Sequence, residues 1–159
     1  MDVTPTTVRA ERDRLLERAD AVVPVVNAVR RDLGDAFDET VPPITRAEYR
    51  AAMDDVFADG DRAVNVAALS MCLREIDVAG DYPGFVVDEL LGRELAATIA
   101  GEQPLRLLAE ATFHYADVTA VTDTAGRAGL DDLDAALAAG VQTRLPGWSW
   151  REGENPFEA

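Results

Sequence analysis

Apolar residues recur at helical spacing along most of this chain. Near the start, apolar residues recur at intervals of three and four from Leu15 to Phe37, which is the pattern of one face of an α-helix. Thr4 followed by Pro5 suits a helix cap and a first helical turn. Pro24 lies inside the pattern and removes one helical hydrogen bond. We expect one long helix kinked at Pro24, and the alternative is two helices divided there.

Two further helices follow the break at "ETVPPI". Thr45 and Glu48 have the spacing of a capping box, in which each side chain bonds the backbone of the other residue. The helix that they begin is expected to end at Gly60. The next segment, at about 62–78, is apolar on almost every side, which is typical of a helix at the centre of a bundle. The sequence therefore predicts that this is the central helix.

The second half of the chain has the same period. One helix is expected to begin at Pro83 and to end at Gly101, and small residues at positions 92, 96 and 100 would let another helix approach it closely. Further helices are expected from Pro104 and over "LDDLDAALAAGV". No stretch alternates apolar and polar residues as a strand would. The prediction is an all-α fold, a single bundle of about six helices over residues 1–145.

Residues 146–159 are predicted to form an irregular aromatic tail. Leu145-Pro146-Gly147 is a helix stop, and the tail after it holds Trp148, Trp150 and Phe157. Two large indoles are costly to leave in water, so we expect the tail to be ordered through Trp150. It either covers a groove of its own bundle, with Trp148 as the anchor, or docks on a second subunit or another protein. The three aromatic residues are our candidates for binding a partner.

The charge of the chain describes its solvent more than its partners. Thirty acidic residues face 15 basic residues, giving a net charge of −15, and every basic residue is arginine. This composition resembles that of cytoplasmic proteins from salt-loving archaea. In molar salt the Debye length falls to about 3 Å, so crowded carboxylates repel one another little. Acidic groups such as Asp54, Asp55 and the aspartates of "DDLD" are accordingly expected to be solvated.

The location of the chain follows from what the sequence lacks. It has no apolar run of membrane-spanning length and no secretory signal, and its single cysteine, Cys72, cannot form an internal disulfide. We expect a cytoplasmic protein that does not enter a membrane.

The best candidate for chemistry is "EATFHYAD". Glu110, His114 and Asp117 fall on one helix face, and imidazole between carboxylates can carry protons or bind a metal. His114 is the only histidine, however, and known metal-binding helices use more ligands at other spacings. We therefore expect no metal and no cofactor.

The leading functional hypothesis is a non-enzymatic protein that binds another protein, as a homo-oligomer, adaptor or assembly factor. One alternative is a small metal-binding protein or enzyme that uses Glu110, His114 and Asp117. A second is a transcriptional regulator with a helix-turn-helix between Thr45 and Ile76. Nucleic-acid binding is disfavoured because no basic stripe is present.

The composition predicts that folding depends on salt. Repulsion among 30 carboxylates is unscreened at low ionic strength, and the free energy of unfolding of a domain is only about 5–15 kcal/mol. We expect the helical circular dichroism signal and the melting temperature to rise between about 0.1 and 3 M KCl. Over this range the Debye length falls from about 10 Å to below 3 Å. Values that stay constant across this range would contradict the prediction.

Overall fold

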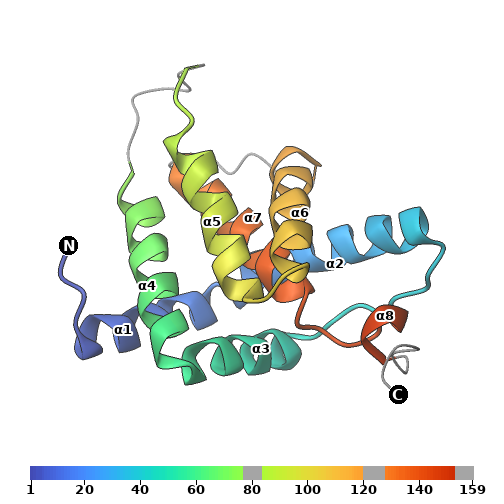
Figure 1. The fold of residues 1–159 in the computed structure, drawn as a ribbon, viewed down its shortest axis with the longest axis horizontal. Helices are drawn as coiled ribbons and strands as arrows, with labels where there is room; N and C mark the ends of the chain where they lie inside the picture. Colours follow the sequence, from blue (N-terminus) through green and yellow to red (C-terminus); the bar gives the residue numbers. More distant parts are fainter. Residues whose placement is uncertain (77–83, 120–127, 153–159) are drawn as a thin grey trace.

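Helices make up most of the chain that the computed structural model describes, which is residues 1–76, 84–119 and 128–152. These ranges contain eight helices and no strand, so the all-α prediction is confirmed. The expected number was about six, and the difference arises because Arg18 divides the first predicted helix and because one helical turn lies in the tail. The helices, labelled in Figure 1, are α1 (Pro5–Glu17), α2 (Ala19–Phe37), α3 (Arg46–Ala58), α4 (Gly60–Glu75), α5 (Val87–Ala100), α6 (Leu105–Thr119), α7 (Ala128–Gln142) and α8 (Ser149–Glu152).

The first predicted helix is interrupted at Arg18 and not at Pro24, which lies inside α2. The guanidinium of Arg18 donates two hydrogen bonds to the carboxylate of Asp134 on α7, at 2.5 and 2.7 Å. The end of α1 leaves carbonyls without helical partners, and the buried Tyr49 hydroxyl donates to one of them, that of Leu15, at 2.8 Å. The position of the break therefore depends on contacts with α3 and α7, which the local sequence pattern does not contain.

The starts of α1 and α3 were predicted correctly. Thr4 caps α1 and Thr45 caps α3, each through a capping box. In the second box, the backbone N–H of Thr45 donates to Glu48 Oε2 at 2.7 Å, and the backbone N–H of Glu48 donates to Thr45 Oγ1 at 3.3 Å. Both caps are local signals; the box at Thr45 is as predicted, and at Thr4 the predicted cap is completed to a box by Thr7.

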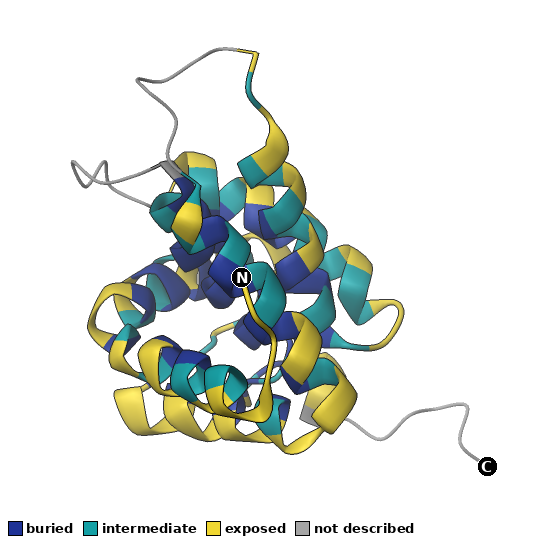
Figure 2. Ribbon diagram, turned by 90° about the vertical axis from the view of Figure 1, so that its left-hand side faces the viewer, coloured by how far each residue is buried: buried dark blue, intermediate teal, exposed yellow. Residues whose placement is uncertain are grey.

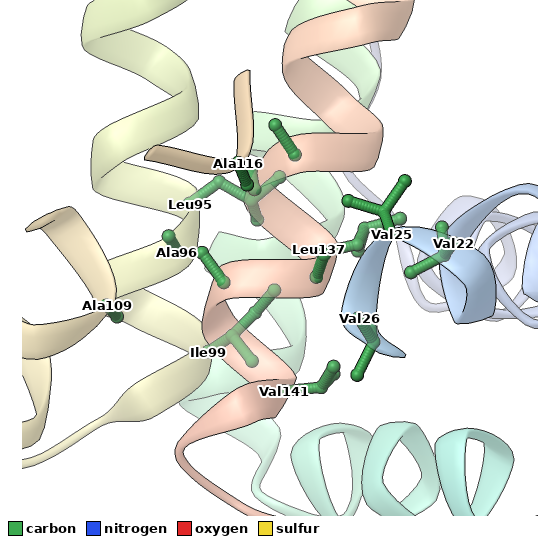
Figure 3. Packing of buried hydrophobic residues seen from close by; sticks show 14 of the residues in the cluster. Val22, Val25, Val26, Leu95, Ala96, Ile99, Ala109, Ala116, Leu137 and Val141 are labelled. Carbon is green, nitrogen blue, oxygen red and sulfur yellow. The ribbon is translucent and has the colours of Figure 1, made fainter. Parts of the chain in front are cut away.

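The centre of the bundle is α7. Every residue from 132 to 143 is buried, and α7 packs against α2, α4, α5 and α6. Figure 3 shows Leu137 and Val141 of α7 among apolar side chains of α2 and α5. The prediction that residues 62–78 form the central helix is wrong, since one face of α4 meets solvent at Val64, which is 44% exposed, and at Asn65. Figure 2 shows the same division, with the buried residues on the inward faces of the helices.

Small residues bring α5 close to its neighbours. A Cβ atom added to Gly140 on α7 would lie 2.6 Å from Ile99 Cβ and 3.1 Å from the carbonyl oxygen of Ala96. A Cβ atom added to Gly92 on α5 would lie 2.5 Å from Cζ of Phe113 on α6. The close approach that the sequence predicted at positions 92 and 96 is therefore present. Neither Gly92 nor Gly140 has space for a methyl group.

A buried carboxylate ties α1 to α4. Glu11 on α1 is fully enclosed, and Arg74 Nη2 on α4 donates to its Oε2 at 2.6 Å, while Arg14 donates to the same oxygen at 3.1 Å. A buried charge with one partner removed is strongly destabilising, so this pair fixes which faces of α1 and α4 meet.

No helix in the described ranges has the length and apolar character needed to cross a bilayer.

Replacing Gly140 by alanine tests the close contact between α5 and α7. The added methyl group would meet the Cβ atom and the backbone of α5, so we expect the free energy of unfolding to fall by about 1–3 kcal/mol. Urea unfolding followed by circular dichroism measures this change. Gly60→Ala is the control, because no atom lies within 4 Å of the added Cβ there. Equal stability of the two variants would contradict the proposed contact.

Candidate functional site

The tail folds back onto its own bundle at Trp148. This side chain is 2% exposed, its ring makes an edge contact with Phe37 at 6.4 Å between centroids, and it stacks with Trp150 at 6.2 Å. Trp148 is thus an anchor within the chain, the first of the two arrangements that the sequence left open. Trp150 is 43% exposed. The described part of the tail ends at Glu152, and Phe157 lies outside it.

A buried arginine holds the start of the tail. Arg30 on α2 is 1% exposed, and its Nε donates to the carbonyl of Pro42 at 3.0 Å, its Nη1 to Gln142 Oε1 at 2.9 Å, and its Nη2 to the carbonyl of Pro146 at 2.6 Å. Its guanidinium carbon lies 5.5 Å from the centroid of the Trp148 ring, within cation–π range. Burial lowers the pKa of Arg30. One side chain therefore connects α2, the segment before α3, the end of α7 and the tail.

Gly147 is required where the tail turns. Its φ is +97°, which residues with a Cβ rarely adopt. A Cβ atom at this position would also lie 3.0 Å from Pro42 Cδ and 3.1 Å from Arg30 Nη2. The turn therefore needs glycine both for its backbone conformation and for the space beside Arg30.

The short helix α8 is fixed at both ends. Glu39 accepts hydrogen bonds from the Ser149 backbone N–H at 3.1 Å and from the Ser149 hydroxyl at 2.5 Å. These bonds lower the pKa of Glu39, the hydroxyl contributing most. At the other end, Arg151 donates to the carbonyl of Thr143. Trp150 is thereby held at a defined place on the surface.

An apolar pocket of about 530 Å³ lies where α2, α6 and α8 meet, and we call it the aromatic pocket. Its walls come from the end of α2, the start of α6 and α8, and Tyr115 on α6 fixes the first two walls by donating to Asp32 Oδ2 on α2 at 2.7 Å. Phe37 is 53% exposed, so the pocket opens to solvent through a large apolar ring. The lining residues are Phe37, Glu39, Pro104, Leu105, Leu108 and Trp150.

An unused hydrogen-bond donor lies next to the aromatic pocket. Trp148 Nε1 is the one buried side-chain nitrogen or oxygen in the described ranges that has no hydrogen-bond partner. Trp148 also lines a cavity of about 10 Å³ that shares Phe37, Leu108 and Trp150 with the aromatic pocket. A buried donor without an acceptor costs about 1–3 kcal/mol. The indole is therefore held by its ring contacts and not by its N–H.

The structure does not bring Glu110, His114 and Asp117 together as a metal site. His114 is exposed and the two carboxylates are half-buried. In the described ranges, no group of three histidine, cysteine, aspartate or glutamate side chains is placed to hold a metal ion. Asp117 instead faces other acids, and burial together with Glu89, Asp131 and Asp88 raises its pKa, with His114 lowering it.

A carboxylate cluster, Asp88, Asp117, Asp131 and Asp132, joins three helices at their ends. Asp88 is in the first turn of α5, Asp117 is near the end of α6, and the other two begin α7. Burial, then the charges of Asp117 and Asp88 and a hydrogen bond with Asp88, raise the pKa of Asp132 to about 8. Near neutral pH, Asp132 is therefore protonated, and its O–H can donate a hydrogen bond to Asp88.

The expectation that the acids of "DDLD" are solvated is wrong for two of them. Asp132 is 7% exposed and Asp134 is 8% exposed, because α7 is enclosed on all sides and its polar positions are covered with the rest. Asp134 is neutralised by Arg18, and Asp132 by its proton. The expectation holds for Asp54 and Asp55, which are exposed.

Sequence reasoning missed most of the aromatic pocket. Phe37 was assigned to the buried stripe of the first helix, but it is the last residue of α2 and points partly to solvent. Nothing in the sequence distinguishes Leu105 and Leu108 from ordinary positions of a helix. Phe37 is the last apolar residue of the helical pattern, just before "DETVPP", and its position at a helix end was the available signal.

Comparison with known proteins gives a family for the whole chain. The family model described as "Domain of unknown function (DUF7984)" matches residues 1–159. The chain belongs to this family. No curated protein and no solved structure matches it. The description of the DUF7984 family names no activity.

Trp148→Ala tests the anchor of the tail. Loss of a fully buried indole is expected to lower the free energy of unfolding by about 3–5 kcal/mol. Trp148→Phe should cost much less, because the lost N–H has no partner to leave behind. Urea unfolding followed by circular dichroism measures both variants, with Trp150→Ala as the control for a half-exposed indole. A phenylalanine variant as unstable as the alanine variant would contradict this account.

Because of the raised pKa of Asp132, we expect the free energy of unfolding to fall as the pH rises. An unfolded aspartate has a pKa of about 3.9, whereas that of Asp132 in the fold is about 8. Between these values the folded chain holds a proton that the unfolded chain has lost, so the free energy of unfolding decreases with pH through this window. Asp132→Asn should reduce this slope and be more stable than the wild type above the window, because the amide has no proton to lose.

Chemical unfolding at several pH values between about 3 and 9, which brackets the two pKa values, measures this effect. Asp61→Asn, at an exposed aspartate in the first turn of α4, is the control and should keep the wild-type slope. An Asp132→Asn variant with an unchanged slope would show that Asp132 ionises in the fold as it does in the unfolded chain.

Proposed function

We propose that this chain acts by binding another protein, and that the partner docks an apolar side chain into the aromatic pocket. The observation that supports this most directly is the exposure of Phe37 and Trp150 at the mouth of an apolar pocket of about 530 Å³. Pockets of about 300–1,000 Å³ lined by apolar and aromatic groups are typical of ligand sites. Aromatic side chains are also the residues that most often dominate binding between proteins.

The scaffold around the pocket favours binding over simple packing. Trp150 is held by its stacking on buried Trp148 and by the bonds of α8 to Glu39 and Thr143. A wall that is already fixed loses little conformational freedom when a partner arrives, which favours affinity. A depression without a binding role would not need a wall held in place by these contacts.

The other hypotheses gain less support. A metal-dependent activity at Glu110, His114 and Asp117 would need a ligand set that the described ranges do not bring together. For a helix-turn-helix, the connection between helices is usually three or four residues, and here Asp59 alone separates α3 from α4. We therefore keep protein binding as the proposal.

Phe37→Glu tests the proposed function, with Leu90→Glu as its matched control. The two side chains are 53% and 51% exposed, and Leu90 lies at the opposite end of α5 from the pocket. A partner isolated with the wild type should be titrated against each purified variant, with light scattering to show whether it is a second copy. We expect Phe37→Glu to weaken binding at least about tenfold, or 1.4 kcal/mol, and Leu90→Glu to bind as the wild type does.

Equal affinity of Phe37→Glu and the wild type would overturn the assignment of the pocket. Equal loss in both variants, with folding intact by circular dichroism, would assign binding to general surface charge instead.

A further inference from the structure

A second pocket, of about 350 Å³, lies beside the aromatic pocket at the end of α2, and we call it the polar pocket. One wall is a row along α2 formed by Asn27, Arg31 and Asp35, and the other wall comes from residues 39–43. Glu39 lines both pockets, so the two are neighbours that share a wall. In Figure 1 this end of α2 lies at the edge of the molecule, next to α8.

Both walls of the polar pocket are held in place by the fold itself. Asn27 donates to the carbonyl of Ile44 at 3.1 Å and accepts from its backbone N–H at 2.8 Å. Arg30 donates to the carbonyl of Pro42 at 3.0 Å. The backbone N–H of Glu39 donates to a carbonyl in the last turn of α2 at 2.8 Å, which brings Glu39 back beside that turn. A segment that docks here therefore meets a preformed surface, which favours affinity.

The charge around the polar pocket favours a cation. Asp35 is exposed, and in the ranges that the structure describes its carboxylate has no hydrogen-bond or ion-pair partner. Hydrogen bonds from the hydroxyl and the backbone N–H of Ser149 lower the pKa of Glu39, so Glu39 is ionised at neutral pH. Among the described residues of the lining only Arg31 is basic, and its Nε lies 3.5 Å from Asp32 Oδ1. The carbonyls at the end of α2 add the negative end of the helix dipole.

Arginine suits this position best among the basic side chains. Its guanidinium carries a fixed fork of N–H donors that matches a carboxylate, and its flat face stacks on aromatic rings. The same fork binds a carboxylate within this fold, where Arg18 donates twice to Asp134. Glu39 supplies a carboxylate and Trp150 an aromatic ring in the lining of the aromatic pocket. A second copy of this chain is a poor occupant, because its net charge of −15 would bring more negative charge to an acidic surface.

We propose that the partner docks by a segment that places an apolar side chain in the aromatic pocket and a nearby arginine in the polar pocket, with Glu39 between them. This inference rests on the proposed function and adds to it the class of partner, a different protein with an apolar residue and an arginine close together. In an extended segment, side chains two residues apart lie on the same side and about 7 Å from each other, which suits two pockets that share a wall. The arginine supplies a selectivity that apolar contact alone does not give.

The test uses defined peptides in which phenylalanine and arginine are separated by one or two glycines. Matched peptides carry citrulline, which has the shape of arginine without its charge. Binding is followed by the amide shifts of the isotope-labelled full chain in about 1 M KCl, where a Debye length of about 3 Å suppresses diffuse attraction to the acidic surface. We expect shifts in both pockets, and for at least one spacing we expect the arginine peptide to bind at least about threefold more tightly, as for one partly exposed charge contact.

Asp35→Asn tests where the arginine binds. This variant should lose most of the preference for arginine over citrulline and should bind the citrulline peptides as the wild type does. Asp61→Asn removes the same charge at an exposed position at the start of α4, and as the matched control it should keep the preference. Glu39 is left unchanged, because it also holds α8 through Ser149.

Equal affinity for the arginine and citrulline peptides at both spacings overturns the inference. A preference that survives in Asp35→Asn, or that falls equally in Asp61→Asn, overturns it as well. In these cases the proposed function still stands if the citrulline peptides bind the wild type and Phe37→Glu abolishes that binding. If the arginine preference holds but Phe37→Glu leaves every affinity unchanged, the role of the aromatic pocket is lost. If no peptide shifts any amide at millimolar concentration, the inference is overturned, and the titration of the partner against Phe37→Glu decides the proposed function separately.

Discussion

The buried guanidinium of Arg30 is the contact on which the surface site depends. Its N–H groups donate to three neutral oxygens, from Pro42, Gln142 and Pro146. A buried charge is tolerated only when its hydrogen bonds are satisfied, so these three oxygens must all be in place. Two of them, from Gln142 and Pro146, lie 112 and 116 residues after Arg30 in the chain. The same cation supports the ring of Trp148, and through it the wall that Trp150 gives to the pocket.

Local signals in the sequence were sufficient for the helices and for some of their ends. The period of apolar residues predicted the all-α fold, and the cap at Thr4 and the capping box at Thr45 predicted where α1 and α3 begin. The break at Arg18 could not be predicted in this way, because the residues that stabilise it, Asp134 and Tyr49, are distant in sequence. A periodic pattern reports which residues of a helix are apolar, but not which other residues they meet.

The same limit explains the errors about burial and about the site. Aspartates in α7 made that helix look like a surface element, although its neighbours enclose all of it from 132 to 143. Phe37 looked like a core residue because it continued an apolar stripe, although the helix ends there and leaves the ring half in solvent. Of the candidate site, the tail tryptophans could be named from the sequence, and the pocket beside them could not. It is assembled from three separate elements, α2, α6 and α8.

The abundance of alanine in α7 has a consequence for how this helix is positioned. Alanine and glycine lose no side-chain rotamer freedom on burial, so enclosing such a helix has a low entropic cost. The helix surface is correspondingly smooth, with few projections to resist a slide along its axis. Its register is set instead by polar contacts near its middle and at its C-terminal end, where Asp134 binds Arg18 and Gln142 binds Arg30. The alanines allow α7 to lie at the centre of the bundle, and Arg18 and Arg30 fix its position along its own axis.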